Sequence, residues 1–140
     1  MNRAEFESLR DLPDKEVTAD IVFTQKNAST LAFQDVEIVN SLGLDLVLNG
    51  SYKPDIPAVK YNFCIKGVGP ICRIEVNGTV HEGEGRTHKH DLQRESCPRK
   101  NLPFAKARRD LQDLTAKQVW NTICTSANIR HAGKFFEPGE

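Results

Sequence analysis

Residues 58–76 read AVKYNFCIKGVGPICRIEV, and this stretch decides the fold class. Apolar side chains alternate with other residues in its first part, where Val59, Tyr61, Phe63 and Ile65 share one parity. Such a period of two is typical of a half-buried strand. Residues 67–70 contain two glycines and a proline and predict a turn. Residues 71–76 alternate again, so the stretch predicts two consecutive strands joined by a turn.

Towards the N-terminus the pattern predicts a short helix and then more strands. Residues 4–12 form the helix, and Pro13 ends it. Strands are predicted over residues 17–23, 30–39 and 42–48, with a hairpin loop at 26–29 and a bulge within 30–39. Asn49-Gly50 predicts a tight turn, because both residues tolerate a positive φ. Residues 51–57 contain two prolines and predict a loop.

Towards the C-terminus the period changes from that of strands to that of helices. Asn77-Gly78 predicts a turn, and residues 79–82 and 87–92 predict a return strand around a glycine-containing loop. Helices are predicted over residues 104–114, with Pro103 in the first turn, and over 116–129, with Thr115 as N-cap. Strands followed by helices favour an α+β fold, a mostly antiparallel sheet of about five or six strands with a C-terminal helical pair packed on one face.

The chain is predicted to form a single domain over residues 1–140. Its parts are a short helix or arm at 1–13, the sheet at 16–92, the helices at 102–130 and a frayed tail at 131–140. The N-terminus has no apolar core of a secretion signal, and no stretch approaches the roughly 18 apolar residues of a membrane span. The four cysteines form no C-x-x-C pair. We therefore expect a cytoplasmic protein with reduced thiols and no membrane partner.

Charge is balanced overall and uneven along the chain. Nineteen basic residues match nineteen acidic ones, but residues 86–109 hold eight Lys or Arg against two acidic residues. A local basic excess of this kind can bind an anion or an acidic partner. The residues expected to hold phosphate groups are Arg73, Arg86, Lys89, Arg94, Arg99 and Lys100.

Three of the four histidines lie close together in this region, at His81, His88 and His90. His88 and His90 are two residues apart and so share one side of a strand. Imidazoles beside arginines can transfer protons while the arginines stabilise a phosphate, which is the chemistry of a metal-independent ribonuclease. The same segment can bind nucleic acid or a protein without reaction. It can also bind a metal, with His81, Asp91 or Cys97 as a third ligand.

The order R-x-(E/D)-x-N-G-x-x-H, a glycine-containing loop and H-x-H resembles small bacterial and prophage proteins related to toxin–antitoxin toxins of the TumE type. The residues that carry the resemblance are Arg73, Glu75, Asn77, Gly78, His81, Gly85, His88 and His90. It covers about a seventh of the chain and implies a toxin that acts on RNA or is neutralised by a small protein.

The leading hypothesis is thus a bacterial, toxin-like nuclease directed at RNA. Its expected acid and base groups are His81, His88 and His90, and it needs neither cofactor nor metal. The alternatives are a non-catalytic module that binds a protein partner or nucleic acid, and a metal-binding histidine cluster. The expected partners are RNA or another polyanion, a small antitoxin, or a second copy of the chain.

Overall fold

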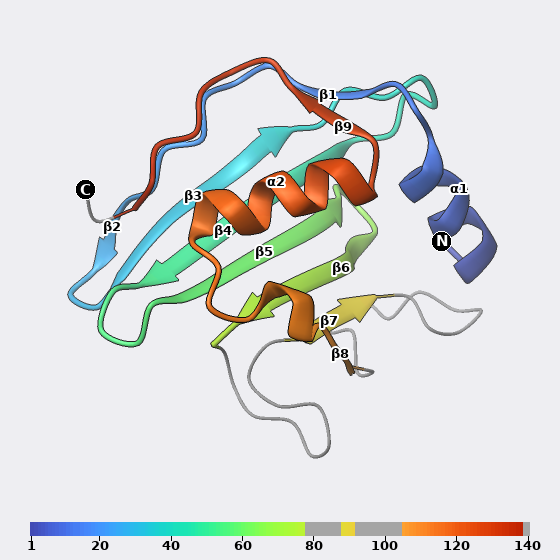
Figure 1. Cartoon of the computed structure of the whole chain (residues 1–140). Coiled ribbons are helices and arrows are strands. Elements are labelled where there is room, and N and C mark those ends of the chain that lie inside the picture. Colours follow the sequence, from blue (N-terminus) through green and yellow to red (C-terminus); the bar gives the residue numbers. More distant parts are fainter. Residues whose placement is uncertain (78–87, 92–104, 139–140) are drawn as a thin grey trace.

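A seven-stranded antiparallel sheet with one long helix on a single face forms the centre of the protein (Figure 1). The computed structural model describes residues 1–77, 88–91 and 105–138, with residues 88–91 and 105–107 described as backbone. The sheet has the order β2-β3-β4-β5-β6-β7-β8, and β1 and β9 form a separate parallel pair. The elements are α1 (Arg3–Asp11), β1 (Lys15–Val17), β2 (Thr24–Asn27), β3 (Thr30–Glu37), β4 (Leu46–Lys53), β5 (Ala58–Ile65), β6 (Gly69–Val76), β7 (His88–Asp91), β8 (Ala105–Ala107), a 3-10 turn (Arg109–Leu111), α2 (Ala116–Ser126) and β9 (Ile129–His131).

This architecture confirms the predicted α+β class and the antiparallel sheet. The alternating residues of β5 are buried, and they face α2 together with Cys72, Ile74 and Val76 of β6. Trp120 of α2 is fully buried against Tyr61, whose hydroxyl donates a hydrogen bond to the Ala116 carbonyl at 2.6 Å. The helix begins where the sequence predicts, because Thr115 and Gln118 form a reciprocal capping box.

The predicted turn at Asn49-Gly50 is wrong, because both residues lie in the middle of β4. That strand pairs with β5 without interruption from Leu46↔Ile65 to Lys53↔Ala58, and the turn follows at residues 54–57. Gly50 is instead needed for packing, since a Cβ at this position would overlap the ring of Phe33 on β3. A glycine inside a strand can mark close packing as well as a turn.

The predicted helix over residues 104–114 is wrong over residues 105–111. These residues form β8, which pairs with β7 through Lys106↔Lys89, and the 3-10 turn that buries Leu111. Pairing with a neighbouring strand overrides the helix propensity of Ala-Lys-Ala. Of the two predicted C-terminal helices, the structure contains the second, which is α2.

The tail is not frayed over residues 131–138, contrary to expectation. β9 pairs in parallel with β1, and Phe135 forms a bridge with Ile21. Figure 1 shows the last segment running beside residues that follow β1. The Trp120 indole N–H donates a hydrogen bond to Nδ1 of His131 at 3.1 Å, which connects the β1–β9 pair to α2. The predicted strand over 17–23 is wrong beyond Val17, because β1 is Lys15–Val17 and Ile21 forms only an isolated bridge.

Four other strand predictions are confirmed with shifted ends. β3 contains the expected bulge, a register shift between Phe33 and Val36. β5 and β6 match the quoted stretch. β7 matches the second half of the predicted return strand, and the predicted strand at 79–82 lies outside the described residues. None of the helices formed by the described residues is long and apolar enough to cross a membrane.

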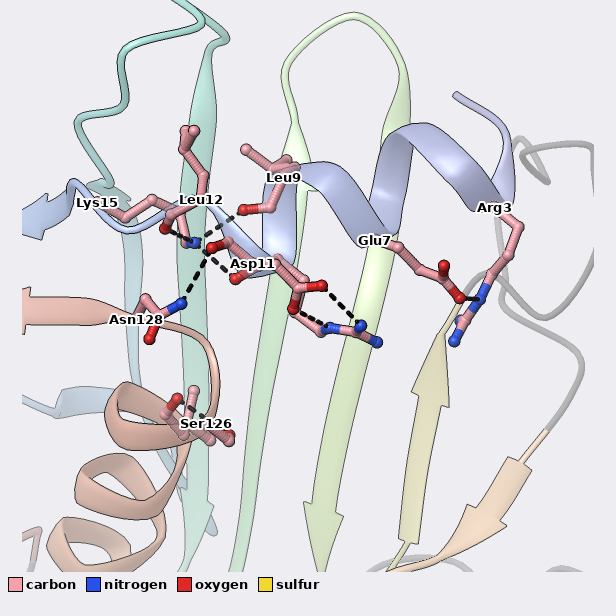
Figure 2. A network of polar contacts seen from close by, with 10 residues as sticks. Arg3, Glu7, Leu9, Asp11, Leu12, Lys15, Ser126 and Asn128 are labelled. Atoms are coloured by element: carbon pink, nitrogen blue, oxygen red, sulfur yellow. Dashed lines mark hydrogen bonds and ion pairs between the residues drawn. The ribbon is translucent and has the colours of Figure 1, made fainter.

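Helix α1 is fastened to the rest of the protein by a buried lysine (Figure 2). Lys15 is 3% exposed, and its Nζ donates to the carbonyls of Leu9, Arg10 and Leu12, each at 2.7 Å. These carbonyls lie at and just beyond the end of α1, where helix carbonyls lack the usual i+4 N–H partner, and the Leu9 carbonyl also accepts the Leu12 N–H at 3.3 Å. Burial lowers the pKa of Lys15 to about 8, so at neutral pH the ammonium is still protonated and keeps its three donors.

Replacing Lys15 with methionine is expected to lower the free energy of unfolding by about 1–3 kcal/mol. The substitution keeps the length of the side chain and removes the three hydrogen bonds of Nζ, after which the Leu9 carbonyl retains only the Leu12 N–H. Urea denaturation measures the change, and Lys26→Met on the exposed strand β2 is the matched control. A Lys15→Met variant as stable as the control would show that water satisfies these carbonyls equally well.

Candidate functional site

The face of the sheet opposite α2 carries polar side chains on its central strands. Lys60 and Asn62 lie on β5 at the positions between its buried residues. In the register of the sheet Lys60 pairs with Glu75 and Asn62 pairs with Arg73 of β6. Directly paired residues of antiparallel strands lie on the same face. The four residues therefore gather on one surface.

The register extends this surface to β7. His90 pairs with Arg73, and His88 pairs with Glu75. Paired Cα atoms of neighbouring antiparallel strands are about 4.5–5.5 Å apart. We call the set Lys60, Asn62, Arg73, Glu75, His88 and His90 the polar face. It places a carboxylate, two cations and two histidine positions on three adjacent strands.

Glu75 is the most buried charged group of the polar face, with 5% of the residue exposed. Its Oε1 lies 3.6 Å from Lys60 Nζ and 3.8 Å from Arg73 Nε. These distances are those of ion pairs rather than direct hydrogen bonds. The Glu75 carboxylate therefore lies between two cations on the polar face.

Two polar atoms of the polar face are buried and make no hydrogen bond with any residue that the structure describes. They are Asn62 Oδ1 and Arg73 Nε. An unmade hydrogen bond of a buried group costs about 1–3 kcal/mol. Such groups are rare in folded proteins, and a site that awaits a ligand is one place where they occur.

The structure separates the predicted site residues into three groups. Arg73, His88 and His90 come together on the polar face. Lys89 pairs with Ile74, a core residue, and so lies on the other face of the sheet. The remaining predicted residues lie outside the described residues, namely His81, Arg86, Arg94, Arg99 and Lys100.

Glu75, Lys60 and Asn62 belong to the polar face but were not predicted as site residues from the sequence, where Glu75 appears only among the residues that carry the TumE resemblance. Arg73 and Glu75 are two residues apart and so share a face, which was the signal for Glu75. Lys60 and Asn62 carried no such signal, because their place beside Arg73 and Glu75 depends on the pairing of β5 with β6.

Metal binding gains no support from the described part of the chain. Among its side chains there is no group of three His, Cys, Asp or Glu that could hold an ion. Asp91 pairs with Cys72, so its position on β7 lies on the opposite face of the sheet from the positions of His88 and His90. Cys97 lies outside the described residues.

The described cysteines are poor nucleophiles. Burial raises the pKa of Cys124 to about 12 and also raises the pKa of Cys64. A thiol reacts as its thiolate, which is scarce at neutral pH for both residues.

Two hollows lie elsewhere on the described part of the molecule. A cavity of about 70 Å³ is lined mainly by apolar side chains of α1, α2 and the sheet, including Phe6, Leu9, Phe63 and Ile123. A cleft of about 380 Å³ lies at the start of α2 and is lined by Tyr52, Leu114 and Glu137 among others. No residue of the polar face is among the described residues that line either hollow.

No protein-family model, curated protein or solved structure matches this chain. The resemblance to TumE-type toxins therefore stays a prediction.

Proposed function

We propose that this protein is a metal-independent nuclease directed at RNA, and that the polar face is its active site. The observation that carries the proposal is the register of β5, β6 and β7, which gathers Lys60, Arg73, Glu75, His88 and His90 on one surface. General acid–base chemistry on a phosphodiester needs these residue types close together.

The proposed reaction is attack of the ribose 2′-oxygen on the adjacent phosphorus. The Glu75 carboxylate accepts the 2′-hydroxyl proton as the O2′–P bond forms. Arg73 and Lys60 stabilise the negative charge that builds on the phosphate oxygens. A histidine of β7 donates a proton to the leaving 5′-oxygen as the P–O5′ bond breaks. The products are a 2′,3′-cyclic phosphate and a 5′-hydroxyl, with no change in oxidation state.

The test is cleavage of end-labelled single-stranded RNA under single-turnover conditions in the presence of a chelator. His88→Ala and His90→Ala are each compared with Lys89→Ala, which changes the residue between them on the other face of the sheet. We expect the variant that removes the general acid to be about 10²–10⁴-fold slower than the wild type, and Lys89→Ala to stay within a few-fold. RNA with a 2′-deoxy nucleotide at the cleaved position should resist cleavage.

Two results would overturn the proposal. One is a folded wild-type protein that cleaves no RNA, and the other is equal loss in Lys89→Ala and the histidine variants. RNA binding that weakens with salt, without cleavage, would instead support the non-catalytic binding module.

A further inference from the structure

Asn62 and Asn49, which lie opposite each other on β5 and β4, differ in the hydrogen bonds of their side chains. Asn49 of β4 pairs directly with Asn62 of β5. The side chain of Asn49 is used by the fold, since its Oδ1 accepts the Asp35 N–H at 2.8 Å and its Nδ2 lies 3.8 Å from Cys64 Sγ. The first bond holds the bulge of β3, where Asp35 has a φ of 56°. Asn49 is therefore a structural residue.

The side-chain carbonyl oxygen of Asn62, in contrast, accepts no hydrogen bond from any of the described residues. Its Oδ1 is buried and unpaired, although Asn62 stands beside Arg73 in the register. A leucine of similar size would avoid the cost of the unpaired acceptor. Two of the neighbours of Asn62 on this face, Lys60 and Arg73, have long side chains that a ligand can displace. The missing partner is a hydrogen-bond donor.

We infer that Asn62 recognises a nucleobase next to the cleaved phosphate, an inference that rests on the proposed nuclease function. Asn62 lies one strand from Arg73, and His90 lies one strand beyond, so the row spans about 10 Å across the sheet. When the adjoining nucleotide lies on the β5 side of a phosphate held at Arg73, its base comes within reach of Asn62. An amino or imino N–H of that base would supply the donor that Oδ1 lacks. Asparagine amides recognise base edges in this way.

The experiment measures cleavage of single-stranded RNAs that differ only in the base next to the cleaved phosphate. It compares the wild type with Asn62→Leu, and with Asn121→Leu, which changes an exposed asparagine of α2 as the control. We expect Asn62→Leu to lower kcat/KM for the preferred base by about 10- to 100-fold and to flatten the preference among bases. A substrate that is abasic at this position should be cleaved equally by the wild type and Asn62→Leu. The thermal midpoint of Asn62→Leu should equal or exceed that of the wild type.

Failure of this inference can be told apart from failure of the nuclease proposal. Cleavage with an unchanged base preference in Asn62→Leu would show that Asn62 does not read the base, while the nuclease stands. A loss that is equal on the abasic substrate, or that accompanies unfolding, would also overturn base recognition. If the wild type binds RNA without cleaving it, the affinities of the same oligonucleotides provide the comparison. The inference then holds only if Asn62→Leu loses a preference that the wild type shows.

Discussion

Replacing Glu75 with glutamine is expected to slow single-turnover RNA cleavage by about 10²–10⁴-fold. The substitution preserves the shape of the side chain and removes the proton acceptor of the proposed reaction. It also removes the negative charge between Lys60 and Arg73, whose nitrogens lie 3.6 and 3.8 Å from Glu75 Oε1. Phosphate binding should not weaken, because both cations remain and the carboxylate that repels the phosphate is gone.

The control for this prediction is Glu37→Gln on the same sheet. Glu37 is exposed and pairs with Val47, so it lies on the same face as the polar residues but on β3, three strands from β6. The Glu37→Gln variant should cleave RNA at the wild-type rate. Both variants are first compared by urea denaturation, because Arg73 loses an ion-pair partner in Glu75→Gln. A folded Glu75→Gln that cleaves as fast as the control would remove Glu75 from the mechanism.

Replacing Gly50 with valine is expected to lower the free energy of unfolding by about 3 kcal/mol or more, the upper end of overpacking effects. The new side chain would enter the space of the Phe33 ring. That ring cannot easily move, because it packs edge-on against Phe23 at 4.9 Å and also contacts Tyr61 at 6.4 Å between centroids. Urea denaturation of the purified variant measures the effect.

A double-mutant cycle with Phe33→Ala separates overlap from a general intolerance of side chains in β4. Phe33→Ala alone creates a cavity and should cost about 3–5 kcal/mol. In the double variant the valine fills part of that space, so the two costs should not add, with a coupling of about 0.5–3 kcal/mol. Ser51→Val, the next residue on the other face of β4, should change stability little. Simple additivity would mean that the ring is not the reason for glycine at this position.

The separation of the polar residues into two faces illustrates what a register adds to a sequence. Residues two apart on a strand share a side, so the sequence alone places Arg73 on the same side of its strand as Glu75, and His88 on the same side as His90. It does not say which side of β7 meets which side of β6. The pairs His90↔Arg73 and Lys89↔Ile74 decide that the histidines lie with Arg73 and that Lys89 does not.

Elements with local signals could be predicted from the amino-acid sequence. The alternation in residues 58–65 and 71–76 produced β5 and β6, and Thr115 fixed the start of α2. These signals arise from burial of one side of a strand and from the unpaired N–H groups of a helix end, which nearby residues satisfy.

Only the tertiary structure decided the elements whose stability comes from distant partners. Residues 105–107 are a strand because β7 lies beside them, and residues 129–131 are ordered because β1 does. A glycine is needed at position 50 because the ring of Phe33 fills the space of a Cβ. The polar face exists because β5, β6 and β7 are neighbours in the sheet. The alternation of apolar and polar residues tells which residues share a side of a strand. The choice of the neighbouring strand depends on contacts between residues far apart in the chain.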